Sequence, residues 1–197
     1  MEAKNSTTVK SVSCEVLTSI LSCYRDHCKY VKSAHVFAHD QLPLVASGVP
    51  LAGRQKNPRD VLMSLKAKLS IPDSCYIDDT GHFNAVEFNI CYNQMIYLLM
   101  AHAVEQGQLD IGIADLAEYK YRMLPDILII EMNNRFKRAM DSNNLYGTVS
   151  IHKCVSRGKM FILKTSCRFF DEHGGEQYGD VTLAIMKPEF SNTLSVA

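Results

Sequence analysis

The stretch FNAVEFNICYNQMIYLLMAHAV, residues 83–104, decides the fold of this chain. Its apolar side chains follow helical spacing and fall on two stripes. One stripe holds Phe83, Val86, Ile90, Tyr97, Met100 and Val104, and the other holds Phe88, Cys91, Met95, Leu98 and Leu99. A helix that is apolar on most of its sides is buried on most of its sides. At about 1.5 Å per residue this one would be roughly 33 Å long, so we expect one long central helix.

On both sides of this helix the apolar residues alternate with a period of two, which is typical of half-buried strands. The strands expected before the helix cover residues 29–37 and 61–69, and those after it cover residues 127–136, 148–155, 161–170 and 180–187. Helical spacing also predicts short helices at residues 12–21 and 111–120. The chain is thus expected to consist of strands, one long helix and four more strands.

Strands and helices that are segregated in this way are typical of an α+β fold. The simplest arrangement is an antiparallel sheet wrapped around the central helix, which is called a hot-dog fold. We expect a single hot-dog domain over residues 1–197, with a disordered tail at residues 1–11. Proline and glycine are frequent in residues 38–58, which we expect to form a loop or a lid insertion.

The composition excludes several classes of protein. The 197 residues are 47% hydrophobic and 21% charged, which are ordinary values for a globular protein. The 21 Lys and Arg residues balance 21 Asp and Glu residues, so the basic excess of a nucleic-acid protein is missing. No apolar run approaches the roughly 18 residues needed to span a bilayer. We expect neither a nucleic-acid partner nor a membrane partner.

The seven cysteines form no CxxC pair, so the sequence gives little support to a metal site. It also contains no GxSxG, P-loop or GxGxxG pattern. The residues before Ser13 are polar and lack an apolar secretion signal, and free thiols are usual in a reducing cytosol. We expect a cytoplasmic protein that holds neither a metal nor another cofactor.

The segment YIDDTGHFNAVE, residues 76–87, leads directly into the long helix. A helix start offers unpaired N–H groups and a partial positive charge, which could polarise a thioester carbonyl in the manner of an oxyanion hole. Capping chemistry is a competing interpretation, with Thr80 or Asn84 as the cap and Glu87 as its partner. His82 fits a catalytic role or a structural one, and spacing alone leaves both interpretations open.

Five other side chains each fit either a functional role or a structural one. Asn93 lies in an otherwise apolar stretch, so its amide binds either backbone or substrate. Tyr24 and Tyr76 suit packing as well as substrate binding. Cys75 is a possible nucleophile, although buried structural thiols are commoner. Arg122 could bind a carboxylate through two hydrogen bonds, or it could lie on the surface.

A basic stretch precedes and enters the strand expected at residues 61–69. It comprises Arg54, Lys56, Arg59, Lys66 and Lys68. Such a stretch could be a solvated face, or it could bind the phosphates of coenzyme A or the acidic helices of a carrier protein. The sequence does not choose between these roles.

At TGHFNAVE, residues 80–87, and CYNQ, residues 91–94, the sequence resembles the FcoT-like family. The resemblance continues at RF, residues 135–136, and at FDEHGG, residues 170–175. It implies a hot-dog fold and an enzyme that acts on acyl thioesters. Members of the family are regarded as long-chain fatty acyl thioesterases, or they add glycine to the β-carbon of a (2E)-enoyl-carrier protein.

The resemblance also implies a set of site residues. The polar residues that it places in the site are Tyr24, Tyr76, Asn84 and Asn93, and we add His82 as the base that takes the amine proton. The substrate-binding residues expected around them are Gly81, Phe83, Glu87 and Arg122. Because Asn84 and Asn93 are separated by about 180° around an ideal helix, we do not expect both to point at one substrate.

These observations predict an enzyme that adds glycine, or a similar amino acid, to a (2E)-enoyl-acyl-carrier protein by Michael addition. Hydrolysis of a fatty acyl-CoA or acyl-carrier protein is the alternative, and a non-catalytic acyl-binding module is a third possibility. The expected partners are a carrier-protein or coenzyme A thioester, glycine, and further copies of the chain. A homodimer or higher homo-oligomer is expected because hot-dog proteins usually pair their sheets.

Overall fold

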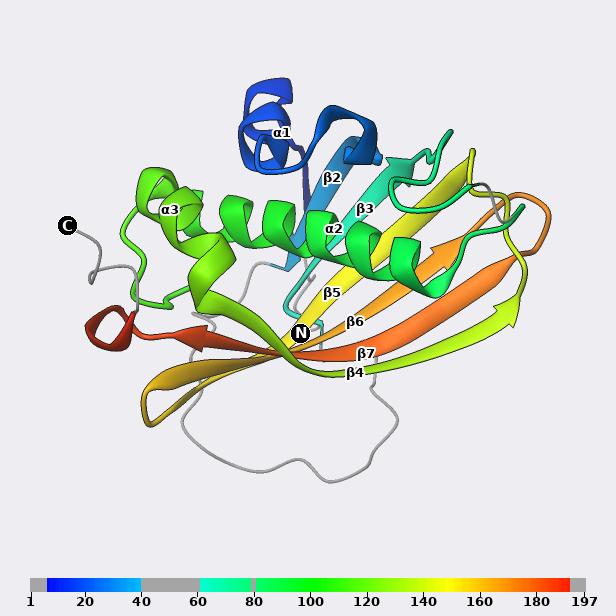
Figure 1. Ribbon diagram of the computed structural model, residues 1–197. Helices are drawn as coiled ribbons and strands as arrows, with labels where there is room; N and C mark the ends of the chain where they lie inside the picture. The colour runs from blue at the N-terminus through cyan, green and yellow to red at the C-terminus, as the bar shows by residue number, and fades with distance from the viewer. Residues whose placement is uncertain (1–6, 40–60, 79–80, 192–197) are drawn as a thin grey trace, which may run out of the picture.

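The computed structural model describes residues 7–39, 61–78 and 81–191 (Figure 1). Its strands are β1 (Thr7–Ser11), β2 (Val31–His39), β3 (Met63–Leu69), β4 (Ile127–Arg138), β5 (Leu145–Arg157), β6 (Met160–Phe170) and β7 (Glu176–Met186). Its α-helices are α1 (Cys14–Leu21), α2 (Ala85–Glu105) and α3 (Leu116–Asp126), and two short 3-10 helices are η1 (Asp26–Cys28) and η3 (Pro188–Phe190).

The strands form one seven-stranded sheet in the order β1-β2-β3-β5-β6-β7-β4. All neighbouring strands in it are antiparallel. The long helix α2 lies across one face of the sheet, and the sheet curves around it (Figure 1). This arrangement confirms the predicted α+β class and the predicted hot-dog fold.

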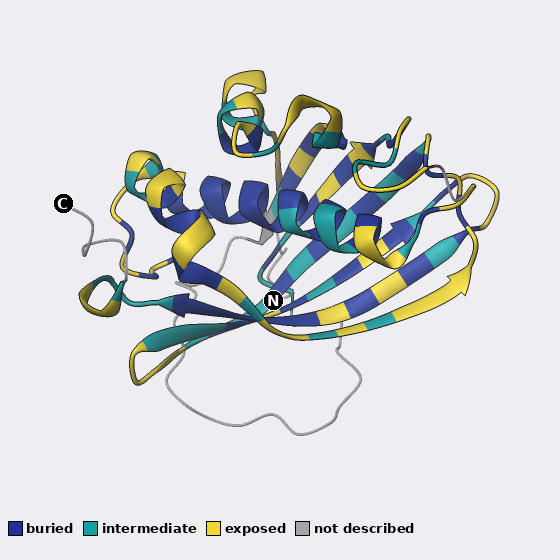
Figure 2. Ribbon diagram, viewed as in Figure 1, coloured by how far each residue is buried: buried dark blue, intermediate teal, exposed yellow. Residues whose placement is uncertain are grey.

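Helix α2 is buried along most of its length, as Figure 2 shows. Gly147 of β5 allows a close approach, because a Cβ atom there would lie 2.6 Å from the sulfur of Met95. The hydroxyl groups of Tyr92 and Thr165 lie 2.7 Å apart, and the Thr165 hydroxyl donates to the Val181 carbonyl of β7. Apolar burial and a short chain of satisfied hydroxyls therefore fix the helix on the sheet.

The side chain of Gln94 ties α2 to the start of β2. Its Oε1 atom accepts hydrogen bonds from the backbone N–H groups of Tyr30 and Val31, and its Nε2 atom donates to the carbonyl of Cys28. Gln94 is fully buried. These hydrogen bonds satisfy both its amide and the backbone groups of Cys28, Tyr30 and Val31.

Two boundary predictions need correction. The disordered tail predicted at residues 1–11 is wrong for Thr7–Ser11, which form the edge strand β1 and pair with His35–His39 of β2. The second short helix begins later than predicted, at Leu116, because the Asp115 side chain accepts a hydrogen bond from Glu118 N and caps it. Residues 1–6 and positions 40–58 of the expected loop lie outside the described residues.

Within the described ranges, no helix combines the length and the apolar character that a membrane crossing requires.

Candidate active site

The first turn of α2 is closed by a capping box. Asn84 Oδ1 accepts hydrogen bonds from Val86 N at 2.9 Å and Glu87 N at 3.2 Å, and Glu87 Oε2 accepts one from Asn84 N. The capping interpretation is therefore correct for Asn84 with Glu87, whereas Thr80 lies outside the described residues. Glu87 is buried, so its carboxylate serves the cap and does not face solvent.

Tyr76 joins this cap from the connection that precedes the helix. Its hydroxyl donates to Asn84 Oδ1 at 2.9 Å, so this oxygen accepts from Tyr76, Val86 and Glu87. These donors fix which end of the amide carries oxygen. The N–H donors of the Asn84 amide are then at its Nδ2 end. The hydrogen bonds of the cap do not include the Ala85 N–H.

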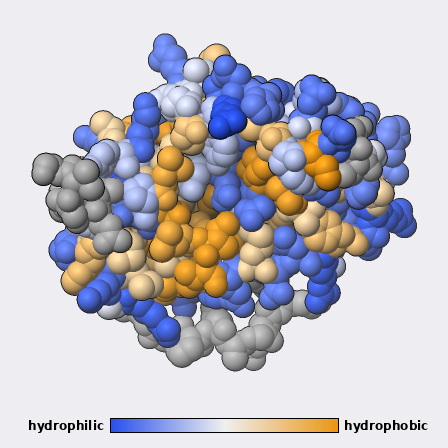
Figure 3. All heavy atoms as spheres, viewed as in Figure 1, coloured by the Kyte–Doolittle hydropathy of each residue, from blue (hydrophilic) through white to orange (hydrophobic). Residues whose placement is uncertain are grey.

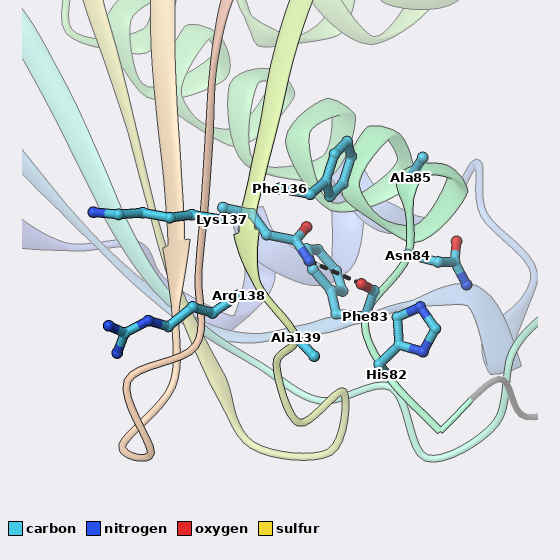
Figure 4. A pocket seen from close by; sticks show the side chains of 9 residues that line it. His82, Phe83, Asn84, Ala85, Phe136, Lys137, Arg138 and Ala139 are labelled. Carbon is cyan, nitrogen blue, oxygen red and sulfur yellow. Dashed lines mark hydrogen bonds between the residues drawn. The ribbon is translucent and has the colours of Figure 1, made fainter.

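Phe83 anchors the segment on which His82 and Asn84 lie. Its N–H donates to the Met140 carbonyl at 3.1 Å, and its carbonyl accepts from Gln177 Nε2 at 2.9 Å, the dashed line in Figure 4. Its ring is fully buried. Because both backbone groups and the ring of Phe83 are held, the backbone that carries His82 and Asn84 is anchored beside β7.

A pocket of about 400 Å³ opens beside this anchor. Its lining consists of His82, Phe83, Asn84, Ala85, Phe136, Lys137, Arg138, Ala139 and Gln177. Figure 4 shows Lys137 and Arg138 extending away from His82 and Asn84, and Lys137 Nζ lies 3.0 Å from Glu176 Oε2. Among the residues that the structure describes, the pocket lining contains no serine, cysteine, aspartate or glutamate.

Asn93 lies at a different cavity. Its Nδ2 donates to Asn89 Oδ1 at 3.1 Å, and both amides line a smaller cavity of about 220 Å³ between α2 and β4. The other lining residues are Ile96, Tyr97, Ile127, Leu128, Ile129 and Leu183. Asn84 and Asn93 thus line different pockets in one copy of the chain, in line with the spacing of about 180° between them.

Tyr24 is half-buried and packs against the hydrophobic core. Burial raises the pKa of Tyr24 well above its ordinary value, with smaller contributions from Tyr97, Cys23 and Cys91. Tyr97 also lines the smaller cavity. The placement of Tyr24 in the substrate site stays a prediction.

The position of Arg122 corrects both roles considered for it. Its side chain is buried and forms hydrogen bonds to Asp126 Oδ2 at 2.7 Å, Glu118 Oε1 at 3.1 Å and the carbonyl groups of Gly112 and Met186. These contacts occupy the guanidinium inside the protein and join α3 to the end of β7. Arg122 is a structural residue because its donors are already used, and it is not on the surface.

The remaining candidates are dispersed. Cys75 is half-buried and lies close enough to the thiol of Cys28 for a hydrogen bond. Lys66 and Lys68 are exposed on β3, with Lys66 Nζ 5.9 Å from the Phe170 ring centre, and Arg54, Lys56 and Arg59 lie outside the described residues. Gly81 is an exposed turn residue with φ of 73°, directly before His82. No group of three or more metal-binding side chains occurs in the part of the chain that the structure describes.

Sequence reasoning missed Gln177, which the fold brings to Phe83 from a position far along the chain. One signal was present. Gln177 occupies the same face of its strand as Val181, Leu183 and Ile185, which are all buried. A polar side chain at an inward position of an otherwise apolar face requires a hydrogen-bonding partner.

Comparison with known proteins identifies the family of this chain. The model of the FcoT-like thioesterase domain matches residues 19–185. The chain belongs to the FcoT-like family. The family that the sequence motifs suggested is thereby confirmed, and with it the general class of acyl-thioester enzyme.

Two relatives of the FcoT-like chain carry the same name, (2E)-enoyl-ACP glycyltransferase, where ACP is acyl carrier protein. The protein from Streptomyces coeruleorubidus is 36% identical over 87% of this chain and 95% of its own length. The protein from Mycobacterium tuberculosis is 30% identical over 59% of this chain and 66% of its own length. The Streptomyces relative thus matches this chain over nearly its whole length.

Solved structures of hot-dog thioesterases resemble the chain more weakly. A phenylacetic acid degradation-related protein from Ralstonia eutropha matches 67% of this chain and 82% of its own, with a TM-score of 0.41 and 11% identity. A Staphylococcus aureus protein, solved in complex with CoA, matches 66% of this chain and 80% of its own, with a TM-score of 0.40 and 15% identity. The family assignment rests on the sequence matches and not on these structures.

Proposed function

We propose that this FcoT-like enzyme adds glycine to the β-carbon of a (2E)-enoyl-acyl-carrier protein. The observation that carries the proposal is the composition of the pocket at the start of α2. Asn84 and His82 line this pocket, and Asn84 accepts a hydrogen bond from the nearby Tyr76. The described lining residues include no hydroxyl, thiol or carboxylate nucleophile. Conjugate addition needs no such group, because the amine of glycine is itself the nucleophile. The name of the Streptomyces relative supports the same reaction.

In the proposed reaction the thioester oxygen lies at the start of α2. The amine lone pair attacks the β-carbon, and the electrons of the carbon–carbon double bond move onto the thioester as an enolate. The Ala85 N–H and the Asn84 amide stabilise the negative charge on the oxygen, helped by the positive end of the helix dipole. His82 takes a proton from the nitrogen, and the α-carbon gains one, so the sum is addition of N–H across the double bond.

We further propose that copies of the chain pair along β4. This strand lies at the edge of the sheet, and among the described strands β7 is the one to which it is hydrogen bonded. Leu128, Ile130 and Phe136 on it are 46%, 55% and 48% exposed, and Figure 3 shows hydrophobic side chains gathered on the face that carries α2 and β4. An apolar edge strand invites pairing. Light scattering should show a dimer or larger assembly, which Ile130→Lys should weaken, and a wild-type monomer would contradict this.

The reaction is tested with a carrier protein that bears a 2-enoyl chain, incubated with the enzyme in the presence and absence of glycine. Intact mass spectrometry should show a gain of one glycine only in the presence of enzyme and glycine. Free acid formed at the same rate with and without glycine would instead support hydrolysis. An unchanged substrate over a broad range of conditions would leave an acyl-binding module, and enzyme localisation in cell fractions would test the cytoplasmic site that we propose for the reaction.

Hydrolysis is the second candidate because the matching family model is described as a thioesterase domain. It would require His82 to activate a water molecule in place of an amine. Coenzyme A thioesters are the alternative substrates in that case, so acyl-CoA should be compared with acyl-carrier protein in the same assay.

A further inference from the structure

Gln177 is an unusual residue in the wall of the pocket. It lies on β7, opposite Phe136 of β4, and its side chain is 2% exposed. It is also the polar member of an inward-facing row that continues through Val181 and Leu183. A buried amide in such a row costs free energy of folding unless both its N–H group and its oxygen form hydrogen bonds.

The two ends of the Gln177 amide have different surroundings. Nε2 donates to the carbonyl of Phe83 at 2.9 Å, and because a carbonyl can only accept, this contact fixes the orientation of the amide. The oxygen Oε1 is buried and accepts no hydrogen bond from any described residue. Because Gln177 lines the pocket, an N–H or O–H group of a molecule bound there is a candidate donor to this acceptor.

We infer that Gln177 Oε1 binds the amine of the incoming nucleophile, an inference that rests on the proposed glycine addition. Around the reacting carbons, the enoyl thioester offers acceptors but no N–H group, whereas the amine offers N–H donors. Phe83, which Gln177 holds, lies between His82 and Asn84 in the chain. The amine would thus lie between the acceptor Gln177, the base His82 and the thioester held at Asn84.

The role of Gln177 follows from the proton balance of the addition. When the nitrogen attacks the β-carbon it becomes a positively charged ammonium that still bears two hydrogens. One hydrogen is lost to His82, and the other donates to Gln177 Oε1, which binds it more strongly as the positive charge develops. An amide oxygen does not take the proton at neutral pH, so Gln177 orients the nucleophile and His82 acts as the base.

The test compares Gln177→Met, which keeps the size and removes both hydrogen bonds, with Tyr178→Phe on the opposite face of the same strand. Initial rates are measured with glycine and with N-methylglycine, whose nitrogen retains after attack only the hydrogen that is lost to the base. We expect Gln177→Met to raise the KM for glycine about tenfold while the KM for the enoyl-carrier protein stays within about twofold. The preference for glycine over N-methylglycine should fall by a similar factor, and Tyr178→Phe should change neither.

Three results would overturn the inference. One is an unchanged KM for glycine. Another is an equal loss with both amines, which would limit Gln177 to holding Phe83. The third is a rise in the KM for the carrier protein alone. That result would mean that an amide N–H of the carrier protein's prosthetic group, and not the amine, donates to Gln177 Oε1. If wild-type enzyme forms no adduct, the proposed function itself fails, and this is seen without any variant.

A second variant covers the case in which Gln177→Met does not fold. Gln177→Glu keeps an acceptor oxygen at the same position and loses the donor to Phe83. It should retain the wild-type preference for glycine over N-methylglycine, although its overall rate falls. Loss of that preference in a folded Gln177→Glu protein would show that the Phe83 contact, and not the acceptor, carries the effect.

Discussion

The first turn of α2 and the middle of the same helix both carry asparagine side chains, but they are built in different ways. At the first turn, Tyr76 donates a hydrogen bond to Asn84, and Gln177 of β7 donates one to the carbonyl of the preceding residue, Phe83. In the middle, Asn93 binds Asn89 one turn away on the same helix. A set of polar groups brought together from distant segments requires the fold to support it, whereas a pair one turn apart needs only a helix. The difference makes the first turn the better candidate for chemistry.

The largest expected effect comes from Asn84→Ala, which removes both the cap and the proposed donor. The rate of adduct formation should fall about 10²-fold or more, as for loss of an oxyanion-stabilising donor. The free energy of unfolding should fall by about 0.5–2 kcal/mol through loss of the cap. Steady-state kinetics and urea denaturation measure the two effects separately.

Asn84→Asp is the matched control for this variant. An aspartate caps a helix as well as an asparagine does, so it should preserve stability, but it cannot donate a hydrogen bond from Nδ2. The rate should therefore remain low. An Asn84→Asp enzyme with full activity would contradict the proposed role of the amide.

Tyr76→Phe should have the next largest effect. Tyr76 is 48% exposed, so removal of its hydroxyl should change the free energy of unfolding by no more than about 0.5 kcal/mol. The hydroxyl restrains Asn84 at 2.9 Å, and its loss should lower kcat about tenfold because the donor is less well positioned. Full activity in both Tyr76→Phe and Asn84→Ala would show that the first turn of α2 is not the site.

Asn93→Ala sharpens the comparison from the other side. The Asn93 amide binds Asn89 within the helix. We therefore expect the substitution to change kcat by no more than about twofold, as for a substitution away from the active site. Asn89→Ala is the matched control at the other end of the same hydrogen bond. A loss as large as that of Asn84→Ala would place Asn93 in the reaction, for instance through the partner copy in a dimer.

The sequence predicted the fold well because the fold depends on periodicity. Residues 83–104 carry apolar stripes, and the four later strands carry an apolar alternation. Both patterns are local, and the structure contains the helix and the strands that they predict. Strand β1 was missed because Thr7–Ser11 contain few apolar residues. In addition, β1 pairs with β2, which is distant from it in the sequence. Such a pairing has no local signal.

The site was predicted in part for the same reason. Asn84 and Glu87 are neighbours on one helix, so their capping box could be read from spacing. Arg122 was placed wrongly because its burial depends on Gly112 and Met186, which approach it only in the folded chain. Gln177 was missed because its partner, Phe83, is distant in the sequence.

The last expected effect is on stability and not on the reaction, and it concerns the hairpin that supports the first-turn site. Asp171 Oδ2 accepts a hydrogen bond from Asp141 N, next to Met140, whose carbonyl holds Phe83 N. Its Oδ1 accepts from His173 N and Gly175 N. Burial acts to raise the pKa of Asp171, but these N–H groups lower it and their effect prevails. The ionised carboxylate is therefore more favourable in the folded protein than in the unfolded chain.

The sign of the pH dependence follows from that lowered pKa. The stabilisation by Asp171 should be complete above the unfolded pKa of about 3.9 and should be lost as the pH falls through the lower folded value. Asp171→Asn removes one acceptor oxygen, so at pH 7 its free energy of unfolding should be about 1–3 kcal/mol below that of wild type. Urea denaturation at a series of pH values from about 7 to about 2 should show this gap constant down to about pH 4 and closing below it. A gap that stayed constant would mean that Asp171 supports the hairpin by shape alone, and that its charge does not help to hold Phe83 and the first turn of α2.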